Sequence, residues 1–544
     1  MEQDNVMGKS IYSDFILKNV PRVITQVDRD EHSTTYGSCD RNHWHLKTRD
    51  FTSSILQQTG LSLALLYSVN FDGNIYYKNE NLKKWSEATV YYWSKIQLKD
   101  GSFNEYYPYE HGFPPTAFSL YGACETYKRL EMMDETLIDK FRKTGKYLIS
   151  HIEERAFNQE IASITALYSL FTIIKEDWVL AGIEPKLNRV LKLQSSEGWF
   201  PEYGGADLGY LSVALDMLSE YYYMSGDTRV KTPIQCVINF ITYFVHPDGT
   251  IGGEYGSRNT TYFLPNGIEN AVQFGDVNAA AIKDRLFNNS KMYNYFMDSV
   301  DDRYFSHYLM HSFLKAIEKE RDNTNVNTVE KLPFLYNHCE YFKESGLISA
   351  TKLPSHVIIS LRKGGVIKVW RDGEEILIDC GYRVNYGKGK VAATNWLDPS
   401  YQISFGNHVA KVRGSMNVVS LKVSTPIMHM GLRLVAFLLG NKIISFLKKK
   451  MIFANKHSDI KFERIIDFRD TEIIIKDTIE SNHKIRLEKA SNMSLRHVAS
   501  GKFYSDSDLL SETGVIATGI NEAKINIIVS LDDGKVTYQY EQLA

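Results

Sequence analysis

A short motif recurs four times in the first 270 residues, and it restricts the possible folds more than any other feature of the chain. Each copy is a glycine-centred turn with aromatic and acidic residues, followed by small and apolar residues at helical spacing. The four turns are Tyr36–Asp40, Asp100–Glu105, Glu197–Glu202 and Asp248–Glu254. Repeated turn-and-helix units stack as helical hairpins whose loops gather on one face. We therefore expect a helical repeat domain with a functional face built from these turns.

Two weaker copies, Ala156–Glu160 and Asp301–Phe305, extend the series. Together the six turns place the starts of the inner helices near residues 51, 115, 159, 208, 267 and 305. Six hairpins that close on themselves form an (α/α)6 toroid, complete or incomplete. We assign residues 1–325 to this domain.

After residue 350 the apolar period changes from helical to alternating. Alternating segments occur at 357–361, 366–370, 375–379, 460–468, 472–479 and 523–531. The turn Arg371–Glu374 separates two of them in the manner of a β-hairpin. The polar stretch Asp322–Glu330 indicates a linker, which we place at residues 326–354. Residues 355–544 are then predicted to form an antiparallel β-sandwich domain, so the fold class is α followed by β.

The bulk composition narrows the function classes. The chain has 63 basic and 65 acidic residues, which gives no sign of nucleic-acid binding. Five cysteines without a CxxC pair indicate a reducing compartment, and the polar start Met1–Ser10 shows no secretory signal, so we expect a cytoplasmic protein.

The most apolar stretch is Leu432–Leu447, which Arg433, Asn441 and Lys442 interrupt. It is shorter than the ~20 residues that a membrane span needs, and we predict two buried strands there. Because Lys448–Lys450 follow, the sequence also allows a peripheral membrane contact.

The predicted loop face carries many side chains that bind sugars. The chain has 34 Tyr and 27 Phe, which suit stacking on sugar rings. His307 and His311 share a helix face, but no HExxH pattern accompanies them, so neither a metal nor a cofactor is predicted. The candidate substrate-binding residues are Trp44, Asn104, Glu105, Tyr107, His111, Gln159, Glu202, Tyr203, Tyr255, Arg258, Asn259 and His311.

Amide, phenol, imidazole and guanidinium groups together suit the removal of the C5 proton of a uronic acid. The sugar carboxylate resists a second negative charge, so an amide or an arginine must neutralise the enediolate that develops. A Tyr or His can then take the proton, and a Tyr can protonate the leaving glycosidic oxygen. The product is an unsaturated uronate, or the C5 epimer if the proton returns from the opposite face.

Helical repeats with these turns, followed by a β domain, resemble the heparinase II/III-like polysaccharide lyases and the related uronate C5-epimerases. The resemblance implies that Asn158 neutralises the carboxylate, that Tyr210 is the base or acid with Tyr203 as its alternative, and that His307 assists. Gln159 departs from the family pattern, because many relatives have His after the Asn. Several relatives hold a metal in the β domain. His408 and His429 have no third ligand beside them here, and no structural zinc is expected.

We therefore expect a lyase that acts on an acidic polysaccharide or oligosaccharide, with a C5-epimerase as the first alternative. A second alternative is a glycoside hydrolase on the same toroid, because the loop face also carries Glu105, Glu202, Asp207 and Glu254. A third alternative is a non-catalytic glycan-binding protein. The sequence leaves the oligomeric state, the uronic acid and the linkage open.

Overall fold

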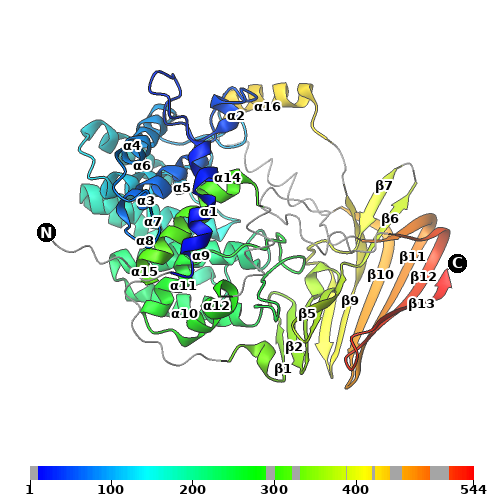
Figure 1. The fold of residues 1–544 in the computed structure, drawn as a ribbon. Helices are drawn as coiled ribbons and strands as arrows, with labels where there is room; N and C mark the ends of the chain where they lie inside the picture. Colours follow the sequence, from blue (N-terminus) through cyan, green and yellow to red (C-terminus); the bar gives the residue numbers. More distant parts are fainter. Residues whose placement is uncertain are drawn as a thin grey trace.

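The chain consists of a helical domain followed by a β-sheet domain that lies beside it (Figure 1). The computed structural model describes residues 10–288, 300–320, 331–387, 389–419, 423–440, 456–490 and 514–543. The predicted linker stretch Asp322–Glu330 lies outside these residues.

Six inner helices form a closed ring in the described part of the helical domain. They follow one another around the ring and are α3 (Thr59–Ser68), α5 (Phe113–Arg129), α7 (Phe157–Ile174), α9 (Leu208–Ser225), α11 (Asn266–Gln273) and α15 (Met310–Glu320). Each packs on the next, and α15 returns to α3. These starts lie close to the six predicted from the repeated turns, which confirms the (α/α)6 toroid.

An outer layer of helices surrounds this ring (Figure 1). It consists of α1 (Ser13–Gln26), α4 (Glu80–Lys95), α6 (Glu135–Ser150), α8 (Asp177–Leu193), α10 (Lys231–Thr242) and α12 (Val277–Phe287). The inner helices are buried almost all round, whereas the outer ones bury one face. This difference is the reason that the inner helices carry apolar and small residues on every side.

The repeated turn requires glycine for a steric reason. Gly101 has a φ of +93°, and a Cβ at this position would lie 2.5 Å from the carbonyl oxygen of Lys143 in α6. Gly198 has a φ of +105°, and its Cβ would lie 2.2 Å from the carbonyl of Cys236 in α10. Each turn therefore touches the backbone of the following outer helix, where only glycine fits.

The β domain contains two antiparallel sheets. The first has the order β1-β2-β3-β4-β5. Its strands are β1 (His338–Phe342), β2 (Leu347–Lys352), β3 (Ser355–Ser360), β4 (Val366–Arg371) and β5 (Glu374–Asp379). β1 and β2 lie inside residues 326–354, which the sequence analysis assigned to a linker. That prediction was wrong there because these strands are short and do not alternate clearly.

The second sheet is larger and has the order β10-β9-β7-β6-β11-β12-β13, with β8 paired to β9. Its strands are β6 (Tyr382–Tyr386), β7 (Lys390–Ala393), β8 (Gln402–Gly406), β9 (Val409–Val419), β10 (His457–Phe468), β11 (Glu472–Lys489), β12 (Val515–Ser530) and β13 (Val536–Leu543). The two sheets share one apolar core, which confirms the sandwich.

The small sheet lies between the helical domain and the large sheet (Figure 1). On β3, Val357 and Ile359 enter the core between the sheets, whereas Ile358 enters the core of the toroid. Successive side chains of a strand point to opposite faces, so the apolar run Val357–Ile359 supplies both cores at once. The two domains are thereby joined by one continuous packed layer.

The predicted pair of buried strands at Leu432–Leu447 is wrong in its described part. Residues Pro426–Leu439 form helix α16, which lies along the edge of the molecule next to α2 (Arg41–Trp44) (Figure 1). Residues 441–447 lie outside the described residues. The apolar run cannot distinguish a strand from a helix by composition alone. None of the helices in the described ranges is long and apolar enough to cross a membrane.

Candidate functional site

The start of α7 and the turn before α9 bring Asn158 and Glu202 together. A backbone bridge pairs Ala156 with Glu202, and the amide of Phe157 donates to the carbonyl of Pro201. This pairing sets Asn158, on the first turn of α7, beside the neighbouring loop. Its Nδ2 donates to Oε2 of Glu202 at 2.5 Å. Two residues that the sequence placed in separate turns therefore form one buried pair.

The Asn158–Glu202 pair has unused hydrogen-bonding capacity. Both side chains are almost fully buried, and Oδ1 of Asn158 and Oε1 of Glu202 have no hydrogen-bond partner. Burial raises the pKa of Glu202 well above its usual range, although Arg258 and Asn158 oppose the shift. Burial thus favours the neutral form of this carboxyl. Buried polar atoms are nearly always paired, so these two oxygens mark the pair as a candidate binding group.

Arg258 lies on the loop between α10 and α11, next to the same pair. Its guanidinium stacks over the ring of Tyr203 at 4.2 Å, and its Nε has no partner. The backbone amide of Arg258 donates to Oδ2 of Asp207 at 2.8 Å. Asp207 also caps α9 by accepting from the amide of Tyr210 at 3.2 Å. One carboxylate therefore fixes both the arginine loop and the helix that carries Tyr210.

Tyr210 belongs to a group of tyrosines beside Glu202. Its ring contacts that of Tyr262 edge to face, with centroids 6.0 Å apart. Burial raises the pKa of Tyr262 and of Tyr308 well above 10, and the nearby Tyr210 and Glu202 contribute to both shifts. Mutual electrostatic influence requires that these four groups share one neighbourhood. Sequence reasoning did not select Tyr262 or Tyr308, although Tyr308 is adjacent to His307.

His307 lies at the margin of this group. It belongs to one π-helical turn, Phe305–Leu309, just before α15. Its Nδ1 bonds the carbonyl of Arg303, and its ring contacts that of Tyr308 at 4.1 Å. Burial, followed by the charge of Arg303, lowers its pKa well below 6.5 and keeps it neutral. His311 is also buried, and its pKa falls to about 3.

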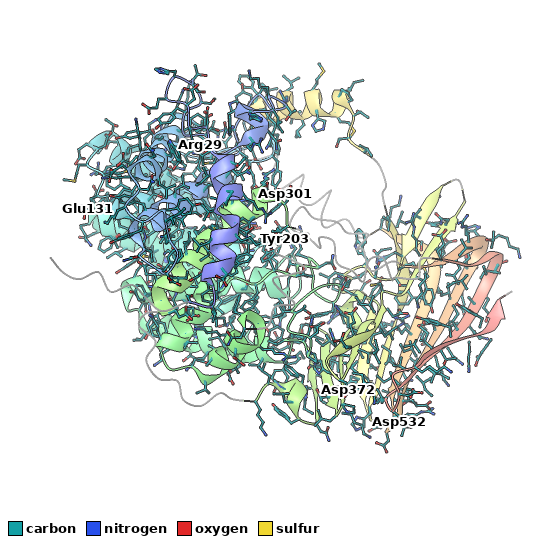
Figure 2. All side chains as sticks on the ribbon, in the orientation of Figure 1. Arg29, Glu131, Tyr203, Asp301, Asp372 and Asp532 are labelled. Carbon is teal, nitrogen blue, oxygen red and sulfur yellow. The ribbon has the colours of Figure 1, made fainter. Side chains whose placement is uncertain are left out.

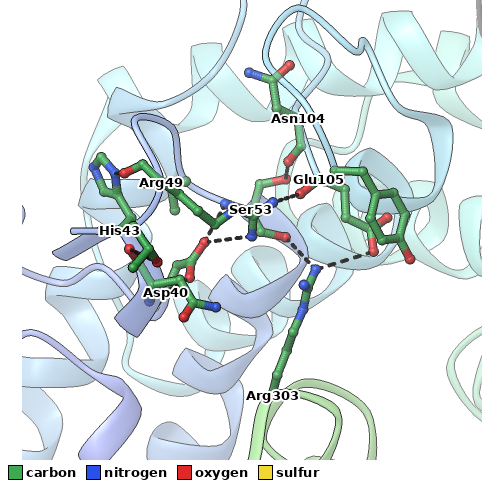
Figure 3. Close-up of polar contacts among 12 residues, drawn as sticks. Asp40, His43, Arg49, Ser53, Asn104, Glu105 and Arg303 are labelled. Carbon is green, nitrogen blue, oxygen red and sulfur yellow. Dashed lines mark hydrogen bonds and ion pairs between the residues drawn. The ribbon is translucent and has the colours of Figure 1, made fainter. Parts of the chain in front are cut away.

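A second polar cluster lies where the ring closes (Figure 3). Arg303 donates to Oγ of Ser53 at 3.2 Å and faces the carboxylate of Glu105 at 3.8 Å. Arg49 donates to the carbonyl of Glu105 at 2.8 Å and lies 3.4 Å from Asp40. This cluster joins the last hairpin to the first two. Glu105, predicted to bind substrate, thus has a partner in the ring closure.

The loop 101–112 is held by its own side chains. Oδ1 of Asn104 accepts from the amide of Glu110, and the Glu110 carboxyl accepts from the amides of Glu105 and Tyr106. Burial and the charge of Glu105 raise the pKa of Glu110 to about 8. Nδ1 of His111 lies 2.6 Å from Asp100. Half-buried Tyr107 has its pKa raised, chiefly by burial.

The remaining predicted residues lie around the same face. The indole of Trp44 donates to the carbonyl of Gln26, and Gln159 has a buried Oε1 without a partner. Tyr255 is buried, and its hydroxyl bonds Nε2 of His246 at 2.9 Å. Oδ1 of Asn259 accepts from Nζ of Lys363. Tyr255 and Asn259 therefore help to hold the loop between α10 and α11, which carries Arg258.

The β domain touches this face directly. Nζ of Lys363, on the 3-10 turn Leu361–Lys363 that follows β3, also donates to the carbonyl of Gly256 at 2.8 Å. Lys368 lies 3.7 Å from Glu254, and the indole of Trp370 donates to Asp248 at 3.0 Å. Figure 2 labels Tyr203 on the side of the helical domain that faces the sheets. The Arg258 loop is thus held between both domains.

Across the described ranges, no three His, Cys, Asp or Glu side chains gather into a metal site. His408 lies on the turn between β8 and β9, and His429 is on α16, so these two histidines belong to separate surfaces.

Comparison with solved structures identifies the fold. A chondroitin AC lyase of Streptomyces coelicolor A3, solved with chondroitin sulphate, gives a TM-score of 0.56 at 10% identity, covering 89% of this chain and 69% of its own. Heparinase III gives 0.51 at 10% identity, covering 100% and 92%. A xanthan lyase of Paenibacillus gives 0.52 at 12% identity over 88% of this chain, which spans 46% of that longer protein.

These similarities establish the polysaccharide-lyase fold, an α/α toroid followed by antiparallel sheets, as the sequence resemblance implied. No protein-family model matches the sequence, and no curated protein matches it either.

Proposed function

We propose that the chain is a carbohydrate-active enzyme that removes the C5 proton of a uronic acid in an acidic polysaccharide or oligosaccharide and cleaves it by β-elimination. The observation that carries the proposal is the buried Asn158–Glu202 pair with its unpaired oxygens, adjacent to Arg258 and Tyr210. A neutral carboxyl can donate a hydrogen bond to a sugar carboxylate, whereas an ionised one would repel it. The pair therefore suits an acidic sugar.

In the proposed reaction Asn158 and neutral Glu202 bind the uronate carboxylate and stabilise the enediolate as it forms. Tyr210 acts as the phenolate and takes the C5 proton, which makes it a phenol; the electron pair of the C5–H bond forms the C4–C5 double bond, and the C4–O bond breaks. The leaving oxygen receives a proton from the same phenol. Arg258 supplies positive charge to the site. His307 acts as a positioning residue that holds Tyr308.

The geometry supports glycoside hydrolysis less well. A hydrolase needs two carboxyl groups on opposite sides of the bond. Glu105 faces Arg303, Glu254 lies near Lys368, and Asp207 caps α9 and binds the Arg258 loop. Of the four predicted acids, Glu202 alone has an unpaired buried oxygen.

Incubation with acidic polysaccharides in deuterated water tests the reaction class. Elimination predicts shorter chains with the ultraviolet absorbance of an unsaturated uronate. Deuterium at C5 of intact polymer would instead identify an epimerase, which could use the same residues. New reducing ends without the absorbance would mean hydrolysis and would overturn the proposal.

Replacing Tyr210 by Phe tests the assigned base. Loss of the phenol should lower kcat by about 100-fold or more while substrate still binds, because general acid–base groups contribute on that scale. Tyr91→Phe, on the exposed side of α4, is the matched control and should retain full activity. Equal activity in both variants would exclude Tyr210 from the chemistry.

A further inference from the structure

Helix α16 exposes an apolar surface that a water-soluble domain normally buries. Its only fully buried side chain is Ala436. Ile427 is 80% exposed, Leu434 62%, Phe437 64% and Leu438 68%. The large apolar residues that face solvent are Ile427, Met428, Met430, Leu434, Val435, Phe437, Leu438 and Leu439. Contiguous exposed apolar surface of this kind marks an interaction site.

The helix is formed and anchored without a partner. Thr425 caps it by accepting from the amide of Met428, and Pro426 occupies its first position. Arg433 forms two hydrogen bonds to Asp50, at 2.6 and 2.9 Å. The ring of Phe437 contacts that of Tyr109 at 5.1 Å. The apolar side chains are therefore presented on a preformed helix fixed to the toroid.

The charge of the surrounding sequence indicates what covers this surface. Next to α16 in the sequence lie Lys422 on one side and Lys442 and Lys448–Lys450 on the other, and no Asp or Glu occurs between Asp398 and Asp459. A second copy would bring two such basic segments together, and like charges oppose that contact. An anionic lipid surface offers both an apolar layer and opposite charge.

We infer that α16 docks the protein on an anionic membrane surface by inserting its apolar side chains into the headgroup boundary. The helix has 14 residues, too few to span the ~30 Å hydrocarbon core, so it lies in the interface. Figure 1 shows α16 at the periphery of the molecule, away from the sheets. Its anchors, Asp50 and Tyr109, belong to the loops of the first two hairpins.

Binding to vesicles tests the inference with the full chain. Vesicles of phosphatidylcholine with about one third phosphatidylglycerol should bind the protein, and pure phosphatidylcholine should bind it at least about fivefold more weakly. Raising the salt from about 50 to about 500 mM should weaken the binding further, because surface charges are screened. No binding to the anionic vesicles would overturn the inference.

A double variant tests the helix itself. Leu434→Ser with Leu438→Ser should reduce binding by about tenfold or more, since it removes two inserted side chains from one helix face. Ile75→Ser with Met133→Ser is the matched control, because these residues are 81% and 95% exposed on the toroid. Circular dichroism should show both double variants folded. Equal vesicle binding by both would contradict the assigned helix.

Sedimentation without lipid tests the competing possibility that a second copy of the chain covers α16. The inference predicts that the wild-type chain and the Leu434→Ser, Leu438→Ser variant have the same oligomeric state. A wild-type dimer that this variant dissociates, together with vesicle binding that the variant leaves unchanged, would identify a second copy as the occupant instead. These measurements do not require turnover, so their outcome is independent of the proposed lyase activity.

Discussion

Glu202 shows how one buried carboxyl can select a substrate by its charge. Its pKa is raised well above 4.5 by burial, so the folded state holds the proton more tightly than the unfolded chain does. Asn158 and Arg258 reduce this shift without abolishing it. The neutral form accepts an acidic sugar as a neighbour, whereas the ionised form repels it. The pH dependence of activity should therefore report on this group.

Wild-type kcat/KM should fall as the pH rises through the raised pKa of Glu202. Glu202→Gln keeps a neutral hydrogen-bonding group, so the variant should keep activity within about tenfold and lose this alkaline decline. The free energy of unfolding changes in the same direction, because the native state binds more protons than the unfolded state above pH ~4.5. The variant should therefore gain stability relative to wild type as the pH rises.

Parallel pH profiles of kcat/KM and of thermal unfolding check this prediction. Glu131→Gln is the control, since Glu131 is exposed and lies on the side of the helical domain away from Tyr203 (Figure 2). If the Glu202→Gln and wild-type profiles remain parallel from acid to alkaline pH, Glu202 does not titrate as argued.

At the scale of residues, the sequence predicted which residues lie on the loop face better than it predicted which of them form pairs. Asn158 and Glu202 were both predicted for the loop face, but their pairing depends on a backbone bridge between Ala156 and Glu202 that no local pattern encodes. Lys363 was missed because it lies 104 residues from its partner Asn259 and belongs to the short 3-10 turn Leu361–Lys363. A lysine in a turn gives no sequence sign of burial.

At the scale of elements, the repeated turns determine where the inner helices begin. Predicted starts at residues 208 and 267 correspond to α9 at Leu208 and α11 at Asn266. The prediction succeeded because the glycine turn has a local steric cause, as Gly101 and Gly198 show. A separate prediction, that of two strands at Leu432–Leu447, was wrong at α16. An apolar run without turn residues inside it is compatible with either a strand or a helix.

Gly101→Ala should destabilise the toroid more than Gly204→Ala. Both glycines have a φ of +93°, so each alanine incurs left-handed strain of about 1–2 kcal/mol. At Gly101 the new Cβ would also lie 2.5 Å from the Lys143 carbonyl, whereas at Gly204 nothing lies within 4 Å. The clash should add about 1–3 kcal/mol, typical of overpacking.

Urea unfolding followed by helical circular dichroism measures this difference. Gly204 serves as the matched control because its backbone strain is equal and its surroundings are open. Equal losses of stability in the two variants would show that the turn can move away from α6, and that left-handed strain alone requires the glycine.

At the scale of the whole molecule, the β domain takes part in shaping the candidate site. The sequence predicted two domains but not their interface, because apolar periodicity does not tell which layer a buried face meets. The apolar run Val357–Ile359 on β3 was the available sign, since both faces of this strand are covered. The 3-10 turn that follows β3 carries Lys363, which reaches the toroid loop that holds Arg258.

Lys363→Met should therefore lower activity through the geometry of that loop. The variant keeps the length and apolar stem of the side chain but removes the hydrogen bonds to Gly256 and Asn259. Displacement of Arg258 by about 1 Å can cost up to about 100-fold in rate, so we expect kcat/KM to fall by about tenfold or more. Lys352→Met, which removes an exposed ion pair with Asp470, is the control and should retain activity. Comparable kcat/KM in the two folded variants would mean that the toroid holds the Arg258 loop without the sheet, and that the β domain contributes only stability.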